Sequence, residues 1–213
     1  ISYIIYKILE QKGIKPDFFA GHSLGEYTAL KDSGILSFED GIKLVKKRGE
    51  FIKNACLKNK GGMIAVLGLN VDEIEKIIKN LNNVEIANYN SPAQTVISYK
   101  GDDAYADEIS SLIKAKLLVK LKVSGPFHSS FMQSASDDLN KELNTGKYEI
   151  KLPKVPVVFN YSAKADVNLE QIRENIVHQV RFSVQWIKSI EFMLANGVST
   201  IVEVGPGKVL SGL

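Results

Sequence analysis

The sequence has little of three features that would narrow its class. It contains a single cysteine, Cys56, so no internal disulfide can form, and we expect a reducing, cytoplasmic location. No apolar run reaches 18 residues, and no basic start precedes an apolar stretch, so neither a membrane span nor a signal peptide is predicted. The net charge is only +3, which gives no reason to expect nucleic acid or a membrane as partner.

Arginine is also scarce, because the 27 basic residues include only Arg48, Arg173 and Arg181. A length of 213 residues with 45% hydrophobic side chains suits one large or two small globular domains. The chain lacks an initiator Met and stops without an obvious end, so we expect it to be incomplete at both termini.

The most informative stretch is Gly21-His-Ser-Leu-Gly25, a G-x-S-x-G pattern. A short apolar run over residues 18–20 predicts a buried strand before it, and the residues after it predict a helix. In such a sharp turn both glycines are expected to be required, because a Cβ would collide with the other arm. Ser23 would then be an exposed nucleophile, with the backbone N–H of Leu24 as one oxyanion donor. The alternative is a glycine-rich turn whose serine caps a helix.

Hydrophobic periodicity outside residues 61–123 predicts alternating helices and strands, which favours an α/β fold with a parallel sheet. Ser37 and Asp40 resemble a capping box, with an apolar stripe following at Ile42, Val45, Ile52 and Leu57. The predicted helices cover 1–12, 37–57, 129–145, 169–179, 184–195 and a stretch after 207, and the predicted strands cover 155–159 and 200–204.

Residues 62–123 follow a different pattern. They predict the order βαββαβ, with strands over 63–68, 84–88, 94–99 and 117–123 and helices over 71–81 and 102–115. A turn is expected at 90–92. Glycine-rich hinges at 61–62 and 124–126 mark this stretch as a small inserted subdomain.

A serine nucleophile needs a base, and the chain has three histidines. His22 adjoins Ser23 and should point the opposite way, and His178 lies in a polar helix where we expect it to be solvated. His128 follows the second hinge, where clefts form, although it could equally cap the next helix. No acidic residue has a context that marks it as the third member of a triad, so a backbone carbonyl could orient His128 instead.

Arg48 is the third candidate for a functional residue, after Ser23 and His128. In a lysine-rich chain, an arginine suggests a need for a planar fork that grips a carboxylate with two hydrogen bonds. The alternative is an ordinary surface charge beside Lys46 and Lys47.

Four segments together now resemble a known family: Gly21-His-Ser-Leu-Gly-Glu-Tyr27, Lys47-Arg-Gly-Glu50, Gly125-Pro-Phe-His128 and Glu203-Val-Gly-Pro-Gly-Lys208. In this order and spacing the chain resembles the malonyl-CoA:acyl carrier protein transacylases. The resemblance implies an α/β-hydrolase-like large subdomain, residues 1–60 and 124–213, and an inserted ferredoxin-like small subdomain, residues 61–123.

The resemblance also implies roles for individual residues. Ser23 would be the nucleophile, His128 its base and Arg48 the clamp on a substrate carboxylate. The backbone carbonyl of Gln185 would orient the histidine, and Asn90 would border the substrate site. His22 would support the turn. The family's N-terminal Gly-Gln-Gly segment, which supplies a second oxyanion donor, is not in this chain.

The activity implied is transfer of a malonyl group from malonyl-CoA to the phosphopantetheine thiol of acyl carrier protein, through a malonyl-serine, in fatty acid synthesis. It would need no cofactor and no metal, and we expect a monomer. The alternatives are an acyltransferase domain of a polyketide synthase, a serine esterase, and a non-catalytic module that docks carrier protein. The sequence leaves open whether the enzyme stands alone, and how it selects among acyl groups.

Overall fold

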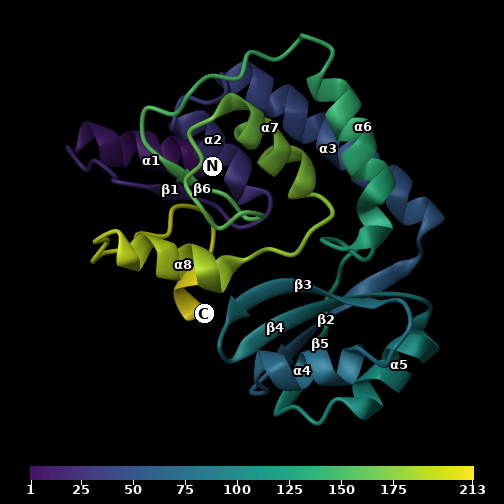
Figure 1. Cartoon of the computed structure of the whole chain (residues 1–213). Helices are drawn as coiled ribbons and strands as arrows, with labels where there is room; N and C mark the ends of the chain where they lie inside the picture. Colours follow the sequence, from purple (N-terminus) through teal and green to yellow (C-terminus); the bar gives the residue numbers. More distant parts are fainter.

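Two β-sheets of different kinds organise the chain, and helices pack against both (Figure 1). The computed structural model describes residues 1–213. One sheet is parallel and pairs β1 (Phe19–Ala20) with β6 (Val157–Val158). The other is antiparallel, in the order β3-β4-β2-β5, and consists of β2 (Gly61–Leu67), β3 (Val84–Ser91), β4 (Gln94–Lys100) and β5 (Leu117–Lys120). The predicted α/β class with a parallel sheet is confirmed.

The helices around β1 and β6 form the larger part of the molecule. They are α1 (Ser2–Gln11), α2 (Gly25–Asp32), α3 (Phe38–Lys58), α6 (Gln133–Leu143), α7 (Leu169–His178) and α8 (Trp186–Ala195), with a short 3₁₀ helix, η1 (Ser130–Met132), before α6. Helices α3 and α6 pack side by side (Figure 1). Leu30, Leu44, Leu139, Phe159 and Ile172 are fully buried between these elements, so one apolar core joins the helices to β6.

Helix α3 begins where the sequence predicts, because the Ser37 hydroxyl accepts the Asp40 backbone N–H at 3.0 Å. Its buried face matches the predicted stripe only in part, because Val45 and Ile52 pack against the core. Leu44 and Ala55 are buried, whereas Ile42 and Leu57 are 55% and 71% exposed. Both sets have helical spacing, so periodicity alone could not decide which set faces α2 and α6.

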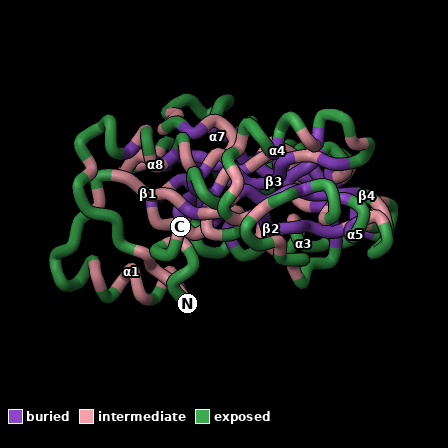
Figure 2. Tube along the Cα trace, turned by 90° about the horizontal axis from the view of Figure 1, so that it is seen from below, coloured by how far each residue is buried: buried purple, intermediate pink, exposed green.

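Helix α1 lies at the edge of the molecule and has no buried residue (Figure 2). Ile1, Ile4 and Ile8 follow the expected helical spacing, yet all three are exposed. No helix in the structure has both the length and the apolar character needed to cross a bilayer.

The smaller part has the predicted element order, with α4 (Val71–Ile78) between β2 and β3 and α5 (Asp103–Leu112) between β4 and β5. Both helices lie on the same face of the antiparallel sheet (Figure 1). Ile64, Ile74, Ile97 and Ile109 are fully buried between the helices and the sheet. Strand β3 runs on to Ser91, through the expected turn, because Ser91 still pairs with Gln94.

The opposite face of this sheet meets the larger part. Met63, Ala65, Ala87 and Val96 form a small buried cluster against which Phe127 packs. Val184 lies parallel to β3, accepting the Tyr89 N–H at 2.9 Å and donating to the Ala87 carbonyl at 2.8 Å. The segment before α8 therefore joins the two parts through backbone hydrogen bonds.

Two expectations for residues after 195 are wrong. Residues 200–204 form no strand, and Ile201 and Val202 are more than half exposed. An apolar run becomes a strand only beside another strand, and none lies next to it here. The stretch after 207 contains only η2 (Leu210–Gly212), one 3₁₀ turn.

Candidate active site

The G-x-S-x-G stretch forms a sharp bend between β1 and α2. Ser23 has φ +50°, a left-handed conformation that few residues with a side chain adopt. A Cβ on Gly21 would overlap the backbone of Gly25, so glycine is required at 21 as expected. The same expectation for Gly25 is wrong, because a Cβ there would meet nothing within 4 Å. The two arms touch on one side of the bend only.

The structure brings Ser23 and His128 together. Ser23 Oγ lies 2.8 Å from His128 Nε2, across 105 residues of chain. His128 is buried and has φ +54°, so both partners occupy strained backbone positions. The alternative in which His128 only caps a helix does not account for this contact.

His128 is oriented by a carbonyl, but not by the expected one. Its Nδ1 donates to the backbone carbonyl of Gln179 at 2.8 Å, which leaves Nε2 free to accept a proton from Ser23. The prediction of Gln185 is wrong, because its carbonyl accepts the backbone N–H and the hydroxyl of Ser189 in the first turn of α8. Gln179 instead follows the last residue of α7, where carbonyls have no partner within the helix.

Burial, together with the smaller effects of the neighbouring Arg48 cation and of His22, lowers the pKa of His128 to about 3. The imidazole is therefore neutral at physiological pH. A neutral imidazole at hydrogen-bond distance from a hydroxyl can act as a general base.

Arg48 reaches into the site from α3 and is not a surface charge. Its Nη2 donates to Ser23 Oγ at 3.2 Å, and its Nε and Nη2 donate to the side-chain oxygen of Gln179 at 3.3 and 3.1 Å. No carboxylate pairs with it. The site therefore holds a cation with neutral partners beside the nucleophile, which favours an anionic group on the ligand.

Gln179 was missed by the sequence analysis, although it makes contacts to three site residues. It is fully buried. Besides accepting from Arg48 and His128, it donates its side-chain N–H to the Ser23 carbonyl at 2.6 Å. In the sequence Gln179 is the last residue of the predicted helix 169–179, and no motif marks it.

Asn90 contacts the bend through His22. Its side-chain oxygen lies 2.9 Å from His22 Nε2, and its amide donates to the side chain of Gln94 at 2.8 Å. The His22 ring also packs edge-on against Trp186, and burial lowers its pKa. His22 therefore points away from Ser23 Oγ, as expected. The third histidine, His178, is half-buried between two aromatic rings rather than solvated.

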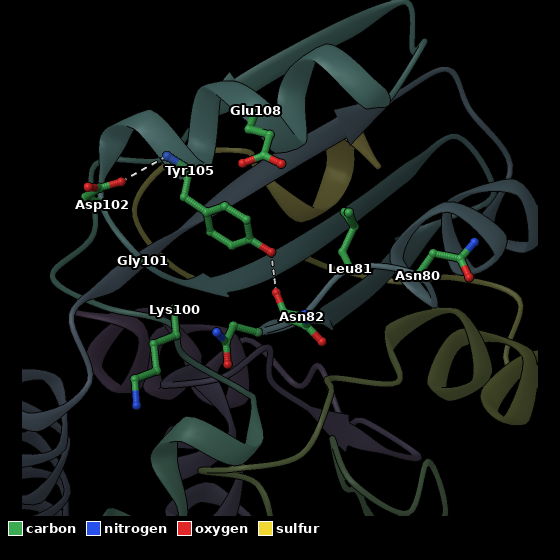
Figure 3. A pocket seen from close by; sticks show the side chains of 9 residues that line it. Asn80, Leu81, Asn82, Lys100, Gly101, Asp102, Tyr105 and Glu108 are labelled. Carbon is green, nitrogen blue, oxygen red and sulfur yellow. Dashed lines mark hydrogen bonds between the residues drawn. The ribbon is translucent and has the colours of Figure 1, made fainter.

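The Leu24 backbone N–H donates no hydrogen bond, so it is available to a ligand oxygen. Beside it, an apolar hollow of about 440 Å³ opens between α1, α2 and α3, lined by Leu24, Tyr27 and Phe38 among others. A second hollow of about 420 Å³ lies in the smaller part, beside α5 (Figure 3). There the Tyr105 hydroxyl donates to the Asn82 carbonyl, and none of the nine lining residues belongs to the site described above.

Glu26, in the first turn of α2, is fully buried behind the bend. Its Oε2 accepts the Asn160 backbone N–H at 2.6 Å, while its Oε1 has no partner. Burial raises the pKa of this carboxyl to about 8, against smaller opposing effects of the Asn160 N–H and the Arg48 charge. The group is therefore mostly protonated at neutral pH.

These features are those of a serine nucleophile activated by a histidine, and comparison with known proteins identifies the class as a serine–histidine acyltransferase. A family model described as an acyl transferase domain matches residues 3–211, and the chain belongs to this family.

Individual relatives indicate which kind of acyltransferase this chain resembles. Malonyl CoA-acyl carrier protein transacylase from Staphylococcus aureus strain MRSA252 is 43% identical over 209 residues, which cover 95% of this chain and 67% of the relative. The protein of the same name from Bacillus subtilis strain 168 is 41% identical over 218 residues, covering all of this chain and 68% of the relative. The chain thus spans about two thirds of the length of these relatives.

Solved structures give the same result. MCAT from Streptococcus pneumoniae superposes with a TM-score of 0.89 at 41% identity, over 99% of this chain and 70% of the other. A second structure is described as PlMCAT:AntF (holo), a type II PKS acyl-carrier protein in complex with its malonyl-transacylase. Its matched chain superposes with a TM-score of 0.92 at 35% identity, over 100% of this chain and 70% of the other.

The geometry of the bend predicts a large effect of substitution at Gly21 and a small one at Gly25. Gly21→Ala should destabilise the fold by about 3 kcal/mol or more, because the new methyl group meets backbone that cannot move aside. Gly25→Ala should change the free energy of unfolding by less than about 1 kcal/mol, since its space is open. Urea denaturation of both variants measures this, and equal losses would contradict the geometry.

The Glu26 carboxyl predicts a pH-dependent stability. Its pKa is about 8 when folded, against an ordinary value of 4.5, so the folded chain binds more protons between these values. The free energy of unfolding should therefore fall as pH rises from 4.5 to 8, by a few kcal/mol, and level off above. Glu26→Gln should flatten this dependence in denaturation between pH 5 and 9, whereas exposed Glu191→Gln should not. Parallel curves for Glu26→Gln and the unmodified protein would contradict the assignment.

Proposed function

We infer that the protein transfers a malonyl group from malonyl-CoA to the phosphopantetheine thiol of acyl carrier protein, as a step of fatty acid synthesis. The observation that carries this inference is that a base and a cation meet at one hydroxyl: Ser23 Oγ accepts from Arg48 at 3.2 Å and donates to His128 at 2.8 Å. The names of the relatives, malonyl CoA-acyl carrier protein transacylases, support the choice of acyl donor and acceptor.

In the first half-reaction, we propose that His128 Nε2 takes the Ser23 proton while Oγ attacks the thioester carbonyl carbon of malonyl-CoA. The Leu24 N–H stabilises the oxyanion of the tetrahedral intermediate. The C–S bond then breaks, and the imidazolium returns its proton to the sulfur of coenzyme A. The product is a malonyl ester of Ser23.

In the second half-reaction, the phosphopantetheine thiol gives its proton to His128 and attacks the ester carbonyl. The C–Oγ bond breaks, and His128 protonates Ser23. The Gln179 carbonyl stabilises the imidazolium in both halves, because it accepts the Nδ1–H that the positive charge polarises. No cofactor or metal takes part in this scheme.

Arg48 selects acyl groups that end in a carboxylate. In the free site its Nε and Nη2 already bind the Gln179 side chain, and this fixes the guanidinium plane. Its Nη1 has no partner, so the hydrogens of this nitrogen remain to bind the malonyl carboxylate.

We further propose that the larger part is an α/β-hydrolase-like subdomain, residues 1–60 and 124–213, and that residues 61–123 are a ferredoxin-like subdomain. The strand order β3-β4-β2-β5 and the two helices on one face support the second assignment. We also propose a monomer in the cytoplasm, in keeping with the lone thiol of Cys56.

A serine esterase is less favoured because it uses a carboxylate to orient its histidine, and here His128 donates to a backbone carbonyl. An esterase would also have no use for Arg48.

Incubation with malonyl-CoA, followed by mass spectrometry, tests the proposed function. We expect a malonyl adduct on Ser23 that disappears when acyl carrier protein is added. Ser23→Ala should form none, whereas exposed Ser111→Ala should react normally. Release of free malonate without an adduct would indicate an esterase, and carrier protein that binds without acylation would indicate a docking module.

Arg48→Ala should reduce malonyl transfer about ten- to a hundred-fold, since a charge-assisted hydrogen bond contributes about 1.5–3 kcal/mol. Acetyl transfer should stay the same or increase, because acetyl has no carboxylate to bind. The neighbouring Lys47→Ala, which loses only a bond to Glu50, should alter neither rate. Equal losses of malonyl and acetyl transfer in Arg48→Ala would show that Arg48 does not select the acyl group.

A further inference from the structure

Ser23 occupies a backbone conformation that needs outside support. A left-handed backbone conformation is unfavourable for a residue with a side chain, because its Cβ comes close to the following carbonyl oxygen. The bend itself belongs to neither β1 nor α2 and lacks their regular hydrogen bonds. The start of α2 helps, since the Glu26 N–H donates to the Ser23 carbonyl at 3.1 Å. The Ser23 N–H and the Gly21 carbonyl, however, have no partner within the bend or in α2.

Asn160 supplies both missing partners through one planar amide. Its Oδ1 accepts the Ser23 N–H at 2.6 Å, and its Nδ2 donates to the Gly21 carbonyl at 2.7 Å. These contacts join positions 137 and 139 residues apart in the chain. They fix the position of Ser23 relative to Gly21, where the bend begins.

Asn160 is itself held on both sides. It follows β6, which pairs in parallel with β1, so its position falls just beyond the end of β1 where the bend begins. Its backbone N–H donates to Glu26, and its carbonyl accepts the Gln185 N–H at 2.9 Å. With 1% of its surface exposed, it has no freedom to serve another partner.

We propose that Asn160 is a positioning residue for the nucleophile: its amide fixes Ser23 so that Oγ lies within reach of His128. This inference rests on the proposed function. It also explains why the Leu24 N–H, rather than that of Ser23, is left to bind the oxyanion, since the Ser23 N–H is already used.

An amide is needed here because one group must accept and donate side by side. In Asn160→Ala both bonds are lost. In Asn160→Asp the oxygen that accepts the Ser23 N–H remains. The second oxygen of an ionised carboxylate would face the Gly21 carbonyl oxygen, and the two acceptors would repel each other. Only a protonated carboxyl can donate to that carbonyl, so the aspartate variant should depend on pH.

The first experiment measures single-turnover acylation of Ser23 by malonyl-CoA. Asn160→Ala should lower the maximal rate about a hundred-fold, since a displacement of about 1 Å has effects of this size, while half-saturation changes less than about threefold because Arg48 is untouched. The matched control is Asn175→Ala, a buried amide that contacts Ser162, Asp166 and Gln171 but not the bend. It should lose stability while keeping its acylation rate.

The second experiment uses the pH profile of Asn160→Asp, normalised to the folded fraction. Its acylation rate should rise more steeply than that of the unmodified protein as pH falls from 8 to 5. His128 stays neutral throughout this range, because its pKa is about 3. Glu26, which accepts the Asn160 backbone N–H and has a pKa of about 8, is present in both proteins, so the comparison with the unmodified protein accounts for its titration. A role limited to stability predicts the same normalised profile for both proteins, and that result would overturn the proposal.

A fluorophosphonate probe separates the two proposals, because it tests the nucleophile without malonyl. Ser23 Oγ attacks phosphorus, the P–F bond breaks, and the serine proton passes through His128 to solvent as fluoride leaves. Slow labelling of Asn160→Ala with normal labelling of Asn175→Ala supports positioning even if malonyl-CoA proves to be the wrong donor. Equal labelling of the two variants would overturn the positioning role.

Discussion

The hydrogen bond between Ser23 and His128 is the contact on which the rest of the structure depends. Its two ends are strained residues held by different parts of the molecule. Pairing of β1 with β6 places the bend, whereas the inserted sheet holds the histidine loop: Ser98 in β4 donates to the Phe127 carbonyl at 2.5 Å, and Glu85 in β3 accepts from Ser130. The smaller part therefore contributes to catalysis by fixing the position of the base, although it provides neither reacting group.

The electrostatics of the site fit the proposed ligand. A carboxylate beside His128 would also lie near Arg48, and it would neutralise the cation that we propose binds the carboxylate of the acyl group. The Gln179 carbonyl orients the imidazole without adding charge, and the Gln179 side chain holds Arg48 in the same way. The absence of a triad acid and the presence of an unpaired arginine thus have one physical reason.

The features that the sequence predicts correctly depend on local signals. The bend, the Ser37 cap and the βαββαβ order depend on residues close in the chain, and each is confirmed. Distant partners have no such signal: Gln179 and Asn160 reach Ser23 across more than 130 residues and carry no motif. Residues 200–204 have strand-like composition but no neighbouring strand. The Gln185 carbonyl, which was expected to orient His128, instead accepts a hydrogen bond from Ser189 in α8.

Two buried polar side chains, Asn160 and Gln179, bond the backbone of the bend, and the buried Glu26 accepts the Asn160 backbone N–H behind it. Burying such groups is unfavourable unless they find partners, and a regular strand or helix offers few because its backbone groups already pair with each other. A strained turn is different, since its N–H and C=O groups are left unpaired where the chain departs from regular structure. The bend therefore satisfies Asn160 and Gln179, and they in turn stabilise a serine conformation that the backbone alone would not keep. Each makes the other tolerable, which is why the reactive residue and its buried polar surroundings occur together.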